Sequence, residues 1–170
     1  MGNIFNMFMV KEGHKALCKT LREREDWYLA IGDCGNENPW ELHEVPPVPD
    51  FETKDMLQER GRRRASTIAY VKEDPVGEIG WGSTFWSITT ENTMHLYLKF
   101  AFSPDEAVDA TVRQIGIFLG TKVQDLIPPG QFFLQPQDIK EKGILFWLQN
   151  VEPRVFSPFQ KETMEYILTF

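Results

Sequence analysis

The sequence predicts an α+β fold, with a mostly antiparallel β-sheet core and two helices in the N-terminal third. Between Met94 and Phe102 apolar side chains recur at every second residue, which is the period of a β-strand. A second apolar run, residues 112–119, follows the polar break Ser103-Pro104-Asp105. Helical patterns are concentrated before Gly61, and residues 135–142 are expected to form a turn or a helical corner. We therefore expect the two apolar strands to lie at the centre of the core.

Both helices are predicted from patterns at the start of the chain. Residues 12–25 place a modest apolar stripe opposite a charged side, which is typical of a surface helix. Asp50 can cap a second helix, residues 50–60, which Gly61 would end. Residues 36–49, between them, hold four prolines, and this favours a loop that crosses the surface over a ligand for a polyproline-recognition domain.

The remaining elements are predicted as strands and turns. A short strand occupies residues 26–31 and another occupies residues 66–72. Residues 79–90 carry aromatic rings among glycines, serines and threonines, which indicates a β-excursion or a large loop. Further strands are expected at three places near the end of the chain: residues 132–134, 144–151 and 161–170.

The chain has 170 residues, and this length predicts a single α+β domain over residues 11–170. Residues 1–10 form a separate apolar arm that includes Ile4, Phe5 and Phe8. The arm is too short for a membrane span, and Asn6 stands where a myristoylation motif requires Ser or Thr. Exposed apolar surface of this kind is a liability in a free monomer, so we expect the arm to pack on this domain or on a neighbour.

Composition excludes several classes of function. The formal net charge of -7 makes the chain a poor binder of nucleic acid. Cys18 and Cys34 match neither a zinc site nor a redox pair, so we expect reduced thiols and no metal. The three histidines and the glycines form no metal-binding, phosphate-binding or nucleophile motif. Most carboxylates stand beside Pro, Gly or Asn, where turns explain them. The sequence therefore predicts no catalytic residue and no cofactor.

Two groups of residues that we expect to be exposed are candidates for contacts with other proteins. Arg62, Arg63 and Arg64 can contact a phosphate, can mark Ser66 for a kinase, or can pair with carboxylates of this chain or of a partner. We favour pairing with carboxylates. The second cluster is the ring-rich segment. With the arm, the predicted interface residues are Ile4, Phe5, Phe8, Arg62, Arg63, Arg64, Trp81, Phe85 and Trp86.

Four short motifs follow one another along the chain. They are KEG at residues 11–13, LAIGD at 29–33, LQERGRR at 57–63 and TVRQIGIF at 111–118. In this order they resemble bacteriophage tail proteins of the baseplate region, including the baseplate-attaching N-terminal domain of tail-collar fibres. Cys34 departs from the usual glycine of that pattern, and Gln114 departs from the usual acidic residue. No fibre shaft follows, which favours a small baseplate component over a receptor-binding fibre.

The resemblance implies a structural virion protein in the baseplate of a contractile tail. It implies contacts with tube, sheath or wedge proteins, multiple copies around the tail axis, assembly in the host bacterial cytoplasm, and contact with neither nucleic acid nor membrane. Two alternatives stay open at this point. One is a carboxylate-based cell-wall hydrolase, and the other is a carbohydrate-binding module that uses Trp81 and Trp86 as stacking platforms.

Overall fold

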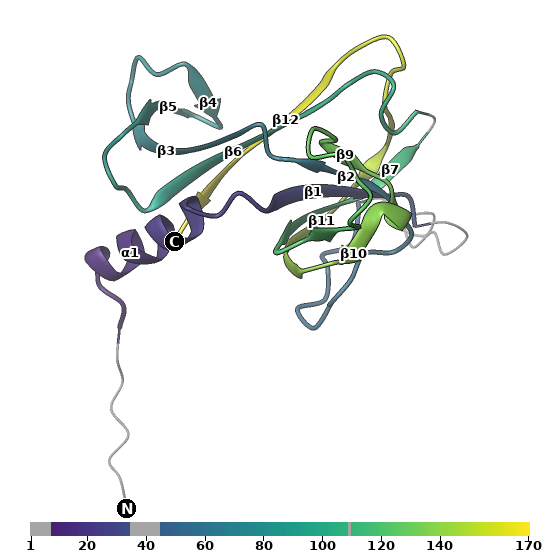
Figure 1. Cartoon of the computed structure of the whole chain (residues 1–170). Helices are drawn as coiled ribbons and strands as arrows, with labels where there is room; N and C mark the ends of the chain where they lie inside the picture. The colour runs from purple at the N-terminus through teal and green to yellow at the C-terminus, as the bar shows by residue number, and fades with distance from the viewer. Residues whose placement is uncertain (1–7, 35–44, 109) are drawn as a thin grey trace, which may run out of the picture. The chain divides into compact units, whose positions relative to one another are not determined.

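The computed structural model describes residues 8–34, 45–108 and 110–170. The chain forms two compact units from alternating stretches. The first unit takes the residues up to Glu25, then Thr67–Leu98 and Glu165–Phe170, and the second takes Asp26–Ser66 and Lys99–Met164. Strands dominate both units, and the described residues contain a single α-helix (Figure 1).

The first unit is built on a sheet with the strand order β12-β6-β3-β5-β4. Its elements are α1 (Lys11–Arg22), β3 (Thr67–Glu73), β4 (Ile79–Trp81), β5 (Thr84–Thr89), β6 (His95–Phe102) and β12 (Glu162–Thr169). The last residues of β6 and the first residues of β12 belong to the second unit. The helix α1 lies against β3 (Figure 1), and the Arg22 guanidinium stands 5.6 Å from the centre of the Tyr70 ring.

A small apolar cluster forms the core of the first unit. Val71, Trp86 and Tyr97 are buried together, and Ile79 and Ile167 pack against them. Trp86 of β5 pairs with Glu73 of β3 and with Ile79 of β4, so three strands meet at this ring. The indole therefore closes one face of the β3-β5-β4 ladder.

The second unit contains a sheet with the strand order β11-β7-β1-β2-β9. Its strands are β1 (Trp27–Gly32), β2 (Glu59–Arg64), β7 (Thr111–Leu119), β9 (Phe133–Leu134) and β11 (Ile144–Val155). A two-stranded sheet pairs β8 (Lys122–Val123) with β10 (Ile139–Glu141), and the short helix η1 (Pro136–Asp138) precedes β10. Every residue of β1 is buried, as expected for a central strand covered on both faces.

The prediction of a second helix over residues 50–60 is wrong. Asp50 does cap a turn, because its Oδ1 accepts the Glu52 N–H at 2.8 Å, but no helix follows. Residues 59–64 form β2, which pairs with β1 on one side and with β9 on the other. Pairing on two sides outweighs a local helix signal that has no apolar stripe to bury.

The structure also refines the expected centre of the core. The two apolar strands, β6 and β7, are both largely buried, yet they belong to different sheets. Residues 79–90 form the hairpin β4–β5.

The strand that begins at Ile144 continues past Pro153 to Val155. It is an edge strand, where a proline removes no ladder hydrogen bond on the outer side, and its pairing with β7 is irregular between Asn150 and Arg154.

An ion pair lies inside the second unit, on β2. Gly61 pairs with Ile31 and Glu59 pairs with Gly32, so Arg60 is an extra residue in the ladder. This bulge turns Glu59 to the same face as Arg62, although residues three apart in a regular strand face opposite sides. The Arg62 guanidinium is fully buried and donates to both Glu59 carboxylate oxygens, at 2.5 and 2.9 Å.

The same guanidinium connects two further segments of the second unit. One of its nitrogens donates to Thr121 Oγ1 at 2.7 Å and to the Lys142 carbonyl oxygen at 2.5 Å. Its carbon lies 3.5 Å from the centre of the Phe118 ring, which provides a cation–π contact. Arg62 thus joins β2 to the end of β7 and to the turn before β11.

We expect Arg62→Leu to destabilise the protein by about 3–5 kcal/mol, because it leaves the Glu59 carboxylate buried without its counter-charge. Urea unfolding followed by circular dichroism measures the loss. The double variant Arg62→Leu with Glu59→Leu should recover part of it, since both charges are then absent. The control Lys122→Ala breaks an exposed pair with Glu141 and should change stability by less than about 1 kcal/mol. Equal effects of Arg62→Leu and Lys122→Ala would contradict the assignment.

His95 is half-buried in the first unit. Its Nδ1 lies 2.9 Å from Thr169 Oγ1, and its ring meets Trp86 edge-on at 4.9 Å between centroids. Burial lowers the pKa of His95 below its ordinary 6.5, nearby Glu73 acts in the opposite direction, and Lys11 lowers it further. The folded protein therefore takes up this proton less readily than the unfolded chain.

Because the unfolded chain binds the His95 proton more readily, we expect stability to be full above pH 6.5 and to fall as the pH drops below that value. The variant His95→Asn should flatten this dependence between pH 7.5 and 5.5. Urea midpoints measured at a series of pH values test it. A variant with the same pH slope as the unmodified protein would show that another group carries the dependence.

Candidate interaction surfaces

The arginine cluster is paired within the chain. Arg62 is buried as described above, so it is not available to a partner, and we do not carry it forward as an interface residue. Arg60 Nε donates to Asp33 Oδ2 at 2.5 Å, and Arg63 pairs with Glu106. The interpretation that these guanidiniums engage carboxylates of the same chain is thus confirmed for Arg60, Arg62 and Arg63. Arg64, at the end of β2, is half-buried.

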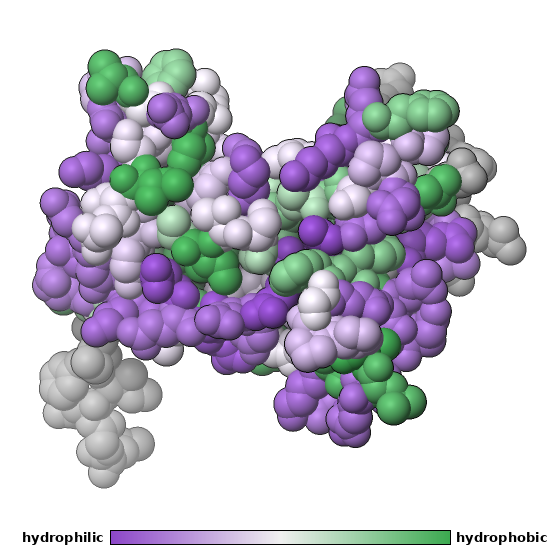
Figure 2. Space-filling model, turned by 45° about the horizontal axis from the view of Figure 1, so that its top comes forward, coloured by the Kyte–Doolittle hydropathy of each residue, from purple (hydrophilic) through white to green (hydrophobic). Residues whose placement is uncertain are grey.

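The ring-rich segment is split between core and surface. Trp81 and Phe85 are 48% and 50% exposed, whereas Trp86 is buried in the apolar cluster of the first unit. The register of the hairpin sets Phe85 opposite Gly80 and Trp81 opposite Thr84, so the two exposed rings lie on opposite faces. Figure 2 shows strongly apolar residues over the β4–β5 hairpin among more polar surroundings. Because Trp86 is buried, it is available neither to a partner protein nor to a sugar ring for stacking.

The N-terminal arm is described only at its end. Ile4 and Phe5 lie outside the described residues. Phe8 is 87% exposed, and Met9 and Val10 are also exposed, immediately before α1 begins at Lys11. The described part of the arm therefore presents apolar side chains to solvent.

The second unit has a further exposed apolar surface that the sequence does not indicate. A groove of about 530 Å³ lies between the segment of residues 48–53 and the first half of β11. We call it the edge-strand groove, and its lining residues are Val48, Pro49, Asp50, Phe51, Thr53, Leu145, Phe146, Trp147 and Leu148. Phe51 is 98% exposed, and Ile144 at the start of β11 is 67% exposed. An apolar run such as residues 144–148 predicts a buried strand, and only the sheet order shows that β11 lies at an edge.

Hydrogen bonds and packing hold the residues beside the groove. Gln114 of β7 accepts the Leu57 N–H at 2.7 Å and donates to Asn150 Oδ1 at 2.9 Å. Asn150 in turn donates to the Pro47 carbonyl oxygen at 2.6 Å. Met56 packs over Gly116, where an added Cβ would lie 2.5 Å from the Met56 sulfur and would require Met56 to shift. The amide at position 114 both accepts and donates, which a carboxylate cannot do.

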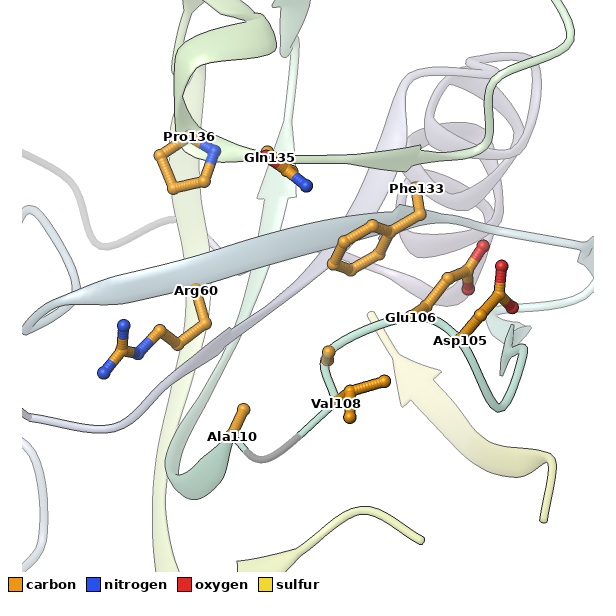
Figure 3. A pocket seen from close by; sticks show the side chains of 9 residues that line it. Arg60, Asp105, Glu106, Val108, Ala110, Phe133, Gln135 and Pro136 are labelled. Atoms are coloured by element: carbon orange, nitrogen blue, oxygen red, sulfur yellow. The ribbon is translucent and has the colours of Figure 1, made fainter. Parts of the chain in front are cut away.

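A second pocket, of about 550 Å³, has a mixed polar lining in the second unit. Figure 3 shows the Phe133 ring beside Asp105 and Glu106, whose carboxylates point to the same side, while the guanidinium of Arg60 points away from them. Glu106 accepts a hydrogen bond from the Arg63 guanidinium and another from the Ser103 N–H at 2.9 Å. That carboxylate is therefore engaged in an internal ion pair, which is not the arrangement of two facing acids that a glycosidase uses.

The described part of the chain contains no group of three or more His, Cys, Asp or Glu side chains placed to hold a metal ion. It also contains no helix with the length and apolar character needed to cross a membrane.

Comparison with known proteins agrees with an interaction role. A family model described as "Baseplate wedge 3 tail fiber network component" matches residues 8–170. "Virion protein 3" of Enterococcus phage phiEF24C is 24% identical over 143 residues, with 76% of each chain covered. The match spans both compact units and the last residues of the arm. The chain therefore belongs to the baseplate wedge 3 tail fiber network component family and is a structural protein of the phage tail baseplate.

Proposed function

We propose that this protein is a non-catalytic connector in the baseplate of a contractile tail. Several copies surround the tail axis, and tube, sheath or wedge proteins hold each copy by permanent contacts. The chain is assembled with these partners in the host bacterial cytoplasm. Family membership supports the baseplate location and contacts with other tail proteins, and a structural family suggests a role without catalysis.

The observation that carries the proposal is the exposed apolar surface present in each unit. The first unit exposes Trp81 and Phe85 on the β4–β5 hairpin, and the second exposes Phe51 and Ile144 beside the edge-strand groove. Covering one such side chain at an interface contributes on the order of 1.5–3 kcal/mol, so several together suffice for a stable complex. Large apolar contacts of this kind are typical of obligate assemblies.

The proposed contact residues are those of the predicted set that the structure does not bury. Phe8, Trp81 and Phe85 are exposed and stay in the proposal. Ile4 and Phe5 stay in it as parts of the same arm, and Arg63 and Arg64 stay as half-buried cations on β2. The arginines other than Arg62 can still contact a partner through the parts of their side chains that solvent reaches.

The double variant Trp81→Ser with Phe85→Ser should fold normally but enter tails poorly. Both rings are half exposed, so their loss has little effect on the core, whereas each ring removed from an interface weakens binding. The test supplies the variant in trans to a phage that lacks the gene and measures its amount in purified tails. We expect at least a tenfold loss. The matched control Leu126→Ser alters a 95% exposed side chain elsewhere and should be incorporated normally. Normal incorporation of the double variant would remove the hairpin from the proposed interface.

Deletion of residues 2–9 should leave a folded protein with reduced incorporation into tails. Val10, which occupies the N-cap position of α1, is retained, so the helix can still form. Circular dichroism and the urea midpoint check the fold, and the same complementation assay measures incorporation. Full incorporation of the shortened protein would refute a role for the arm.

A further inference from the structure

The β4–β5 hairpin of the first unit carries no charge. Residues 79–90 contain no Asp, Glu, Lys or Arg, whereas these four residue types make up 25% of the chain. The register places Ile79, Trp81 and Trp86 on one face of the hairpin, and Ile88 follows Trp86 on that face. Trp86 is buried, but Trp81 and Ile88 are 48% and 58% exposed. We call the surface made by Ile79, Trp81 and Ile88 the hairpin face.

The helix α1 lies against the other side of this sheet. Its Arg22 guanidinium stands over Tyr70 of β3, and Tyr70 points away from the side of its neighbour Val71. Val71 pairs with Ile88, so Ile88 lies on the side opposite α1. Residues 45–108 are described without a gap, and they include the hairpin and both of its flanks. The hairpin face is therefore an apolar sheet surface that α1 does not cover.

Carboxylates border the hairpin on both sides in the sequence. Glu73, Asp74 and Glu78 precede it and Glu91 follows it, whereas Lys72 is the single lysine or arginine in residues 67–98. Lys72 lies 4.0 Å from Glu91, and both side chains are largely exposed, so this pair contributes little. We call the three carboxylates that precede the hairpin the acidic rim.

Hydrogen bonds fix the acidic rim against the hairpin. The Asp74 carboxylate accepts the Ser87 hydroxyl at 2.7 Å, and the Asp74 N–H donates to the Phe85 carbonyl oxygen at 2.9 Å. The turn also packs closely on β5, because an added Cβ at Gly77 would overlap the Trp86 carbonyl oxygen. A complementary partner must therefore offer apolar side chains next to a cation.

The residues that lead into α1 have this chemistry. Phe8, Met9 and Val10 are 87%, 58% and 70% exposed. Lys11 follows them, is exposed, and makes no ion pair with another described residue. Lys19 lies on the same side of α1 two turns later and adds a second exposed cation. Residues 8–11 thus place three apolar side chains beside a lysine, and no carboxylate precedes Glu12.

We propose that the hairpin face of one copy receives residues 8–11 of a neighbouring copy. The apolar side chains of this segment cover Trp81 and Ile88, and its Lys11 ammonium meets the acidic rim. A second copy is the partner because this chain carries both halves of the complementary pair. The inference rests on the proposed function, since it requires several copies in one baseplate. The two surfaces differ, so the contact runs head-to-tail from copy to copy around the tail axis.

Exchange of charges across the contact tests the proposal. Lys11→Glu sets an acid against the acidic rim, and Glu78→Lys sets a base against Lys11, so each variant should reach at most a fifth of the normal amount in purified tails. A chain with both changes restores opposite charges and should regain at least half of the normal amount. The control Lys161→Glu reverses an exposed lysine outside both surfaces and should be incorporated normally. Circular dichroism and the urea midpoint check that every variant folds.

Cross-linking identifies the two copies directly. Tails are assembled in cells that supply Met9→Cys and Thr84→Cys proteins to a phage lacking the gene, and purified particles are oxidised mildly. Position 84 stands opposite position 81 on the hairpin face. The native Cys18 and Cys34 give little background, since both are buried and burial raises the pKa of each thiol to about 11. We expect a dimer with one protein of each kind, and at least tenfold less from the control pair Met9→Cys with Leu126→Cys.

The other outcomes overturn the proposal in distinguishable ways. Tails that contain both cysteine variants but no cross-linked dimer show that another protein covers the hairpin face, while the baseplate role stands. A disulfide that forms only within a chain carrying both cysteines shows that residues 8–11 fold back on their own subunit. A charge-exchanged chain that stays at the level of the single variants shows that Lys11 and Glu78 do not meet. Absence of the unmodified protein from tails would instead refute the proposed function, and this contact with it.

Discussion

The second unit depends on a buried guanidinium that connects three segments of the chain: β2, the end of β7 and the turn before β11. Arg62 contacts the Glu59 carboxylate, the Thr121 hydroxyl, the Lys142 carbonyl oxygen and the Phe118 ring. A charge removed from water is costly unless each of its donors has an acceptor, so these segments must come together correctly before Arg62 can be buried. The bulge at Arg60 makes this possible, because it brings Glu59 to the face of Arg62. Specific placement of β2 follows from this requirement.

That placement also sets the position of the interaction surfaces. β2 and β7 lie on either side of β1, and β11 pairs with the other side of β7, so β11 is an edge strand of this sheet. Gln114 of β7 then holds the residues on both sides of the edge-strand groove through Leu57 and Asn150. The groove itself is lined by residues 48–53 and 145–148, and the neighbouring strand β7 holds the residues next to both walls. Membership in a baseplate wedge family makes this exposed groove a candidate contact surface for another baseplate protein.

Much of the strand content could be predicted from the sequence, because period-two patterns and glycine-containing turns are local signals. The predicted first helix (residues 12–25) nearly matches the observed α1. The strands predicted at residues 66–72 and 161–170 nearly match the observed β3 and β12. Three features could not be predicted in this way. The strand β2 looks helical locally and is determined by pairing on both sides, and the division of β6 and β7 between two sheets depends on long-range topology. The burial of Arg62 and Trp86 depends on partners distant in sequence. Local sequence therefore predicted both residues to lie on the surface, and both are buried.

The two thiols have a consequence for the particle after it leaves its host. Cys18 is fully buried and Cys34 nearly so, and with pKa values of about 11 roughly one thiol in ten thousand is ionised at neutral pH. Since the thiolate is the form that reacts with oxidants and attacks disulfides, we expect both sulfurs to oxidise slowly. We therefore expect these two cysteines of the assembled particle to remain in the thiol form under oxidising conditions outside the host.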